Sequence, residues 1–218
     1  MNRPFRLATA ALIASAALLL TSCGSDDDTS KDDDKIAGAE QGGEKSPSPS
    51  GPAKSAADRP KIELPSDLTY EFEWSKTGDK SKDAVLADTE QYLKAVDLAI
   101  AEQKPLHKAY RFYSEGEAAA GSQKFVQEYV DYKDRITGTK RYFHARVDVT
   151  GDKTAGIVYC EDQSKAHNKS LKTGKTAKAS APSKDDFVLY SSRLHRNDKG
   201  VWITETTTSD RGNATCQP

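Results

Sequence analysis

A histidine and two aspartates in this chain suggest general acid–base chemistry. His144 and Asp148 lie in a segment in which apolar and polar residues alternate, and Asp162 follows the next strand-like segment. An imidazole within hydrogen-bonding reach of a carboxylate is a pair that general acid–base catalysis uses. However, His144 shares its side of the segment with Tyr142, Arg146 and Asp148, a set that is typical of a face in contact with water. A solvated histidine is therefore the simpler interpretation, and a catalytic His144 or Asp162 is the alternative.

Other chemical motifs are incomplete in the sequence. No Gly-x-Ser-x-Gly motif occurs, and Gly174-Lys175-Thr176 lacks the leading glycine of a phosphate-binding loop because Lys169 stands there. No pair at the spacing of a zinc motif occurs among the four histidines, which are His107, His144, His167 and His195. We therefore expect no catalytic residue, no metal site and no cofactor.

Composition narrows the class of protein. The chain has 218 residues, of which 36% are hydrophobic and 30% charged, and its mean hydropathy is -0.74. A single globular domain usually has an apolar share near half, so either part of the chain is disordered or the core is small. The polarity excludes a polytopic membrane protein. The balance of Lys+Arg 32 against Asp+Glu 33 excludes a strongly basic nucleic-acid-binding protein, so we expect no nucleic-acid partner.

The amino terminus has the pattern of a secretory signal. Arg3 and Arg6 precede the uncharged apolar run Leu7 to Leu20, which as a helix would span roughly 21 Å, too short for a membrane of roughly 30 Å. The following Leu20-Thr21-Ser22-Cys23 resembles a bacterial lipobox. This resemblance implies cleavage before Cys23 and attachment of a diacylglycerol to its thiol. The alternative is an ordinary secretory signal with a chance cysteine.

The next segment has the composition of a tether. Residues 23–66 hold two Asp triplets and the run Ser46 to Pro52, which is rich in Ser and Pro. Such a segment cannot bury enough apolar surface to offset its ordering entropy, so we expect a disordered acidic spacer. We therefore predict a lipoprotein signal peptide at 1–22, this tether at 23–66 and a folded domain at 67–218. The expected location is the extracellular face of the cell membrane, where the lipid would anchor the protein.

Two further cysteines stand in the folded part. If Cys23 carries lipid, Cys160 and Cys216 form a pair in an oxidising compartment. We expect a disulfide between them that fixes the carboxyl-terminal tail to the sheet. Two free thiols are the alternative.

The first half of the folded part has helical periodicity. Residues 68–74 alternate as in a short strand or a docking extension. A helix is predicted over 82–103 because Leu86, Leu93 and Ile100 recur at sevens, with a polar opposite face, and Pro105 ends it. Further helices are expected at 106–113 and 118–134. The polar face of the first helix carries Asp83, Glu90, Lys94 and Asp97.

The second half changes to a period of two. Strands are predicted over 142–149, 155–161, 187–196 and 201–208, and a long polar loop over 163–186. On this interpretation the buried side of the first of these strands carries Phe143, Ala145, Val147 and Val149. The loop is rich in lysine, so it is either solvated or in contact with anionic headgroups or wall polymers. Helices followed by an antiparallel meander predict an α+β domain.

Three short motifs accompany this order of elements: Thr137-Gly138-Thr139 before the first long strand, a Gly151-Asp152 hairpin, and Gly200-Val201-Trp202 at the last strand. The whole arrangement resembles the NTF2-like fold. It is similar to extracytoplasmic NTF2-like lipoproteins of actinobacteria, including Mce-associated proteins, over roughly residues 82–210. The lipobox departs from the Mce-associated pattern, which has a transmembrane helix. The resemblance implies a cone with amino-terminal helices packed on a curved antiparallel sheet.

The expected function is that of a non-catalytic binding or interaction module of the cell envelope. Its partners would be the membrane, through the lipid, and an envelope ligand or protein. The alternatives are an isomerase- or dehydratase-type enzyme that uses the cone, or an accessory subunit of an envelope complex. Most aromatic side chains of the second and third helices are expected in the core. The alternative is a ligand pocket, whose candidate residues are Tyr110, Tyr113, His144, Asp162 and Trp202.

Overall fold

The computed structural model describes residues 58–178, 181 and 183–218. Cys23, the signal segment and most of the predicted tether lie outside these residues. The described chain contains, in order, β1 (Leu68–Phe72), α1 (Lys80–Ala101), α2 (Lys108–Tyr113), α3 (Gly116–Tyr132), β2 (Asp134–Thr150), β3 (Thr154–Ser170), the 3₁₀ turn η1 (Lys184–Asp186), β4 (Phe187–Arg196), β5 (Trp202–Arg211) and the 3₁₀ turn η2 (Ala214–Cys216). No helix of the described residues is both long and apolar enough to cross a membrane.

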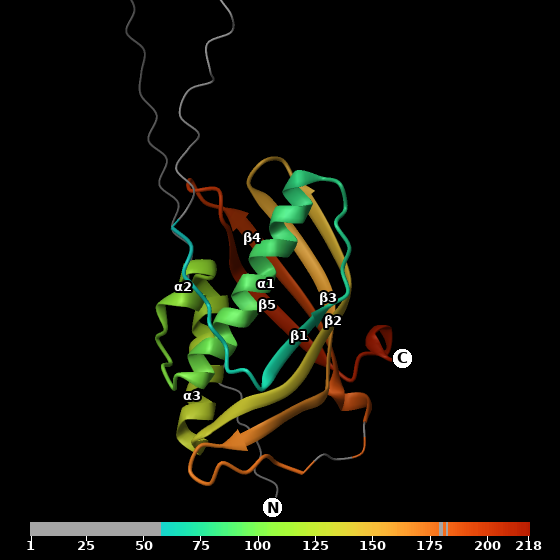
Figure 1. The fold of residues 1–218 in the computed structure, drawn as a ribbon. Helices are drawn as coiled ribbons and strands as arrows, with labels where there is room; N and C mark the ends of the chain where they lie inside the picture. The colour runs from blue at the N-terminus through green and yellow to red at the C-terminus, as the bar shows by residue number, and fades with distance from the viewer. Residues whose placement is uncertain (1–57, 179–180, 182) are drawn as a thin grey trace, which may run out of the picture. The chain divides into compact units, whose positions relative to one another are not determined.

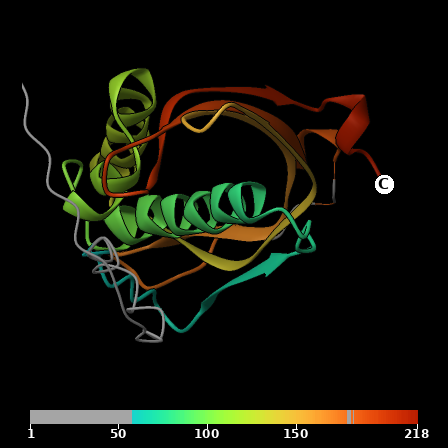
Figure 2. The same ribbon diagram turned by 90° about the horizontal axis from the view of Figure 1, so that it is seen from above.

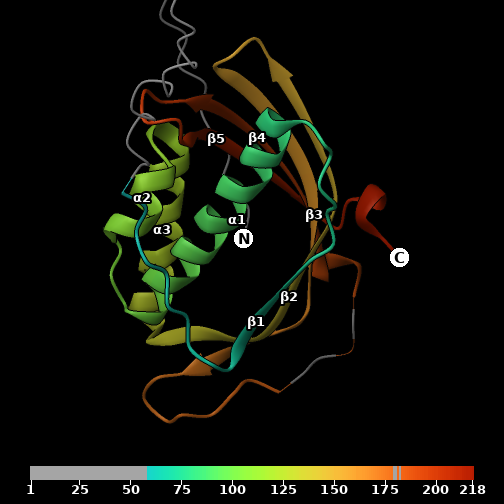
Figure 3. The same ribbon diagram turned by 45° about the horizontal axis from the view of Figure 1, so that its top comes forward.

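The long helix α1 lies in the concavity of a curved sheet (Figures 1 and 2). The carboxylate of Asp79 caps its first turn by accepting hydrogen bonds from the amides of Ser81 and Lys82. Its buried side includes the predicted Leu86 and Ile100. Helices α2 and α3 lie beside it and pack against β5 (Figure 3). Helices on one face of a curved sheet confirm the predicted α+β class.

The sheet has the order β1-β2-β3-β4-β5. The pairs from β2 to β5 are antiparallel, as expected for a meander, but β1 pairs with β2 in parallel. The prediction of a wholly antiparallel sheet is therefore wrong at this edge. The long segment from Glu73 to Lys133, which contains all three α-helices, provides the crossover that a parallel pair requires.

The prediction of a polar loop from residue 163 is wrong for the first residues of that loop, because β3 continues to Ser170. Residues 165–170 pair with the start of β2, which begins at Asp134. Gly138 allows this close pairing: a Cβ there would lie 2.1 Å from the carbonyl oxygen of Lys165. Backbone pairing and ion pairs, such as the one between Lys169 and Asp67, stabilise this polar end of the sheet. It therefore lacks the alternation of apolar and polar residues by which a strand is usually recognised in sequence.

A β-bulge reverses the predicted faces of β2. His144 and Ala145 lie opposite the single residue Tyr159, and His144 has a φ of 54°. The extra residue puts Tyr142 on the same buried side as Val147, while Phe143 packs with the disulfide on the other side of the sheet. The prediction that Tyr142 shares a wet face with His144, and that Phe143 shares a buried face with Val147, is therefore wrong.

The segment before β1 is anchored to the domain. Arg59 forms an ion pair with the carboxylate of Asp88, which is 2% exposed and also accepts a hydrogen bond of 2.8 Å from the amide of Trp202. Ile62 and Leu64 pack against the core next to it. The last residues of the predicted tether therefore form contacts with the domain.

We expect Arg59→Met to destabilise the full chain by about 2 kcal/mol, because it leaves the buried carboxylate of Asp88 without its cation. The loss is smaller than for a fully buried pair because Arg59 is 43% exposed. Urea unfolding measures the effect. Lys61→Met is the control, since Lys61 is 83% exposed and pairs with the exposed Glu63. Equal midpoints for the two variants would contradict this role of Arg59.

Candidate functional site

A cavity of about 330 Å³ lies between α1, α3 and the inner face of the sheet. Its walls are partly aromatic and partly polar. The lining residues are Tyr92, Leu93, Val96 and Asp97 of α1, Glu117, Ala118, Gly121, Ser122 and Phe125 of α3, and Lys140, Tyr142, Tyr159, Glu161, Gln163, Tyr190, Thr207, Ser209 and Arg211 of the sheet.

A buried ion cluster forms the polar side of this cavity. The ammonium of Lys140 lies 2.9 Å from Oδ2 of Asp97 and 3.0 Å from Oε1 of Glu161. All three residues are buried. A second bulge, in which Gln163 and Ser164 on β3 lie opposite Lys140 alone, shapes the sheet at this point.

Neutral side chains complete the hydrogen bonding of the two carboxylates. The hydroxyl of Tyr70 donates to Asp97. Glu161 accepts hydrogen bonds of 2.9 Å from the hydroxyl of Tyr142 and 2.8 Å from Nε2 of Gln163. Each buried carboxylate therefore has the shared cation and neutral hydrogen-bond donors as partners, which is the condition under which buried ions are tolerated.

This pairing moves the pKa values of Lys140 and Glu161 away from neutrality. Burial lowers the pKa of Lys140, but Asp97 and Glu161 outweigh burial and hold that pKa well above its usual value. Burial raises the pKa of Glu161, but Lys140 and the hydrogen bonds outweigh burial, so the pKa is lowered. Burial, followed by the charge of Glu161, raises the pKa values of Tyr142 and Tyr190. These groups keep one protonation state across the neutral range, so they can bind by hydrogen bonding but are poorly suited to proton transfer.

The cluster also has no room for a divalent cation between its carboxylates. Lys140 already occupies the position between Asp97 and Glu161. Among the described residues, those that line the cavity include no histidine and no cysteine. The residues of this cavity therefore do not form a soft-metal centre.

The three aromatic residues that the pocket alternative named lie in the core. Tyr110 and Tyr113 pack with α1 and β5, and the hydroxyl of Tyr110 donates to the carbonyl of Pro105. Trp202 is 1% exposed and packs against α1 and the neighbouring strands. None of the three lines the cavity between α1, α3 and the sheet.

The structure also separates the two predicted acid–base residues from the cavity. His144 is exposed at the bulge of β2, with its ring against Phe143. Asp162 accepts a hydrogen bond from the amide of Ser164 and pairs with Arg141 at 3.2 Å. Neither His144 nor Asp162 lines the cavity.

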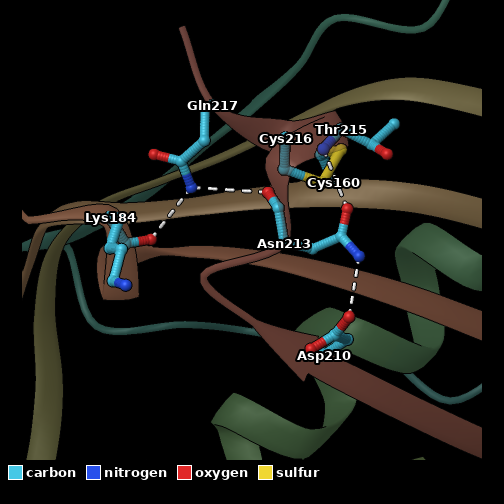
Figure 4. The surroundings of a disulfide bond; sticks show 7 residues. All are labelled: Cys160, Lys184, Asp210, Asn213, Thr215, Cys216 and Gln217. Atoms are coloured by element: carbon cyan, nitrogen blue, oxygen red, sulfur yellow. Dashed lines mark hydrogen bonds between the residues drawn. A yellow bond between two sulfur atoms is a disulfide. The ribbon is translucent and has the colours of Figure 1, made fainter.

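The predicted pairing of Cys160 with Cys216 is present as a disulfide (Figure 4). It joins β3 to η2 on the side of the sheet away from α1 (Figures 1 and 3). Asn213 caps η2 by accepting from the amide of Thr215, and Gln217 donates to the carbonyl of Lys184. The tail is therefore fixed by one covalent bond and several hydrogen bonds.

Sequence reasoning missed the ion cluster. The wet face predicted for the first helix includes Asp97, which is 2% exposed in the structure. A signal was present: Asp97 follows Leu93 by four residues and precedes Ile100 by three, so it lies on the apolar stripe. A charge on such a stripe requires a buried partner, which here comes from the sheet.

No protein-family model matches the chain, and no curated protein matches it. Similar solved structures include the intermembrane-space region of the chloroplast protein ARC6, at 11% identity and a TM-score of 0.41, covering 60% of this chain and 96% of that chain. A ketosteroid isomerase-like protein from Erwinia carotovora atroseptica matches at 11% identity and a TM-score of 0.40, covering 61% and 97%. A hexachlorocyclohexane dehydrochlorinase from Novosphingobium barchaimii matches at 10% identity and a TM-score of 0.40, covering 61% and 90%. At these values the likeness is one of fold in outline, and it assigns no activity to this chain.

Proposed function

We propose that this protein is a membrane-anchored lipoprotein of a bacterial envelope whose NTF2-like domain binds a small, largely apolar ligand without transforming it. The cavity between α1, α3 and the sheet is the proposed binding site. Its volume of about 330 Å³ is in the range of small-molecule sites. Helices on the inner face of a curved sheet support the NTF2-like assignment.

The observation that carries a binding role is the internal pairing of the cavity's charges. Lys140 lies between Asp97 and Glu161, and Tyr142 and Gln163 satisfy Glu161 further. At α1 and the sheet a ligand therefore meets aromatic rings and ions that are already paired, while Glu117, the third carboxylate of the lining, lies exposed on α3. Such a site favours a neutral ring compound with one or two hydrogen-bonding groups.

The envelope location rests on the sequence around Cys23. Two acyl chains provide stable anchoring, since each buried CH₂ contributes about 0.8 kcal/mol. The disulfide between Cys160 and Cys216 supports an extracytoplasmic location, because disulfides persist mainly in oxidising compartments.

The catalytic alternative finds less support in the geometry. It requires His144 or Asp162 inside the cavity, and neither residue lines it. The two buried carboxylates that line it, Asp97 and Glu161, have Lys140 as a partner.

The binding role predicts that N-phenyl-1-naphthylamine, a neutral aromatic fluorophore, binds the full chain saturably and raises its melting temperature. Gly121→Leu is expected to weaken this binding at least about ten-fold, because the new side chain enters the space that the ligand would fill. Gly121 lines the cavity, and a Cβ there has no neighbouring atom within 4 Å, so the new side chain begins in open space. Fluorescence titration measures the affinity.

Ala120→Leu is the matched control, since Ala120 is exposed on the same helix and does not line the cavity. It should bind the fluorophore as the wild type does. No saturable binding by the wild type, or equal binding by Gly121→Leu, would argue against the proposed site.

A further inference from the structure

We propose that Glu115, His195 and Glu205 form a binding site for a divalent transition-metal ion, with Zn²⁺ as the best fit. Nδ1 of His195 lies 3.3 Å from Oε1 of Glu205 and 3.7 Å from Oε1 of Glu115. The three donor atoms all lie within 4.8 Å of one another. One imidazole nitrogen and two carboxylate oxygens are ligands that Zn²⁺ accepts.

The spacing of these atoms fits a metal better than a hydrogen bond. Nδ1 of His195 is inaccessible to solvent and has no hydrogen-bond partner among the residues that the structure describes. Both of its carboxylate neighbours lie beyond the usual 2.7–3.2 Å of an N–H···O hydrogen bond. Metal–ligand distances of about 2.0–2.2 Å in a tetrahedron put two ligand atoms about 3.3–3.6 Å apart. The two measured separations lie at or near this range.

The backbone holds the three side chains together from distant parts of the sequence. Glu205 is the extra residue of a bulge on β5, between Thr204, which pairs with Leu194, and Thr206, which pairs with Arg193. The amide of Glu115 donates to the carbonyl of Thr204 at 3.0 Å, which fixes the start of α3 beside this bulge. The position of the ligands is therefore set by the sheet and does not depend on a mobile loop.

Charge and exposure also suit a cation. Nε of Arg193 donates to Oε2 of Glu205 at 3.1 Å, which leaves Oε1 directed at His195. A neutral imidazole and two carboxylates give a donor set of charge minus two, and the Arg193 guanidinium beside Glu205 leaves a local charge of minus one, which still attracts a divalent ion. Glu115 is 59% exposed, so water can complete the coordination. None of the three ligands lines the cavity described above, so the two proposals can fail separately.

The test is a Zn²⁺ titration of the EDTA-treated full chain in competition with a chromophoric chelator. We expect one tight equivalent per chain, and at least about ten-fold weaker binding in both His195→Gln and Glu205→Gln. His144→Gln is the matched control, because His144 is an exposed strand histidine outside the cluster. It should bind Zn²⁺ as the wild type does.

Two further measurements keep the result independent of folding. Glu115→Gln changes an exposed side chain, so it should retain the wild-type melting temperature yet lose affinity. Zn²⁺ should also shift the imidazole ¹⁵N resonances of His195. Unchanged Zn²⁺ affinity in His195→Gln would mean that other residues bind the metal, and it would overturn the proposal. A wild-type chain that binds no tight equivalent of Zn²⁺ would overturn it as well.

Discussion

Replacing Lys140 by methionine is expected to destabilise the domain by about 3–5 kcal/mol, because it leaves two buried carboxylates without their shared cation. Asp97 and Glu161 are each 2% exposed, and the ammonium of Lys140 lies within 3.0 Å of both. Methionine keeps most of the side-chain volume, so the loss reports the charge rather than a void. Urea unfolding at neutral pH measures the change.

The pH dependence of this loss distinguishes its cause. In the wild type the pKa of Glu161 is lowered, so the stability contributed by its ionised form is lost as pH falls below the ordinary carboxyl range. In Lys140→Met, burial acts without the cation and is expected to raise that pKa. Its penalty then grows as pH rises above about 4.3, the unfolded value. The two proteins should therefore differ less in stability at pH 4 than at pH 8.

Lys153→Met serves as the control for this variant. Lys153 is 73% exposed and lies 3.5 Å from Asp198, which is almost fully exposed. We expect no measurable change in its unfolding midpoint, because exposed pairs contribute little. A stability loss in Lys140→Met that is small, or equal at pH 4 and pH 8, would contradict the assignment of a buried ion cluster.

The second large effect is expected for the double variant Cys160→Ser/Cys216→Ser. The disulfide spans 56 positions, and the chain-entropy relation gives about 4 kcal/mol for a loop of this length. At about 2–4 °C per kcal/mol for a domain of this size, the melting temperature should fall by roughly 10 °C. Scanning calorimetry of the full chain measures it.

Reduction of the wild type provides an independent comparison. Dithiothreitol should lower its melting temperature by a similar amount and leave that of the double variant unchanged. After reduction, the hydrogen bonds from Gln217 to Lys184 and within η2 still hold the tail. Because they are weaker than the covalent bond, part of the stability loss should be local to the carboxyl terminus. An oxidised wild type that melts at the same temperature as the double variant would refute this stabilising role.

Helices and the carboxyl-terminal strands could be predicted from the sequence because their signals are local. The leucine spacing and Pro105 placed the long helix within about two residues of α1, and the prediction for 187–196 coincides with β4. Turn residues and periodicity of two or 3.6 depend only on neighbours along the chain. These elements need no knowledge of the partner strand.

The bulges and the buried charges could not be predicted in the same way. The bulge at His144 and Ala145 reverses which side of β2 is buried, and it is defined by pairing with Tyr159 on another strand. Lys140 appears polar in sequence, and only its position between Asp97 and Glu161 makes it part of the interior. This explains why the pocket alternative named aromatic residues of the core and not the residues of the ion cluster.

A search by local spacing likewise missed Glu115, His195 and Glu205. The two glutamates and the histidine come from the start of α3 and from two strands, and residues 115 and 195 meet only after the sheet has formed. Metal-binding motifs are recognised when several ligands fall within one helix or loop. Ligands from separate elements give no such signal.

NMR mapping of the full chain titrated with N-phenyl-1-naphthylamine tests directly whether the cavity between α1, α3 and the sheet binds a small apolar ligand. We expect chemical-shift changes concentrated on cavity residues such as Tyr92, Gly121 and Tyr190. Shifts confined to exposed apolar side chains such as Leu106 and Tyr132, with the cavity residues unchanged, would contradict it.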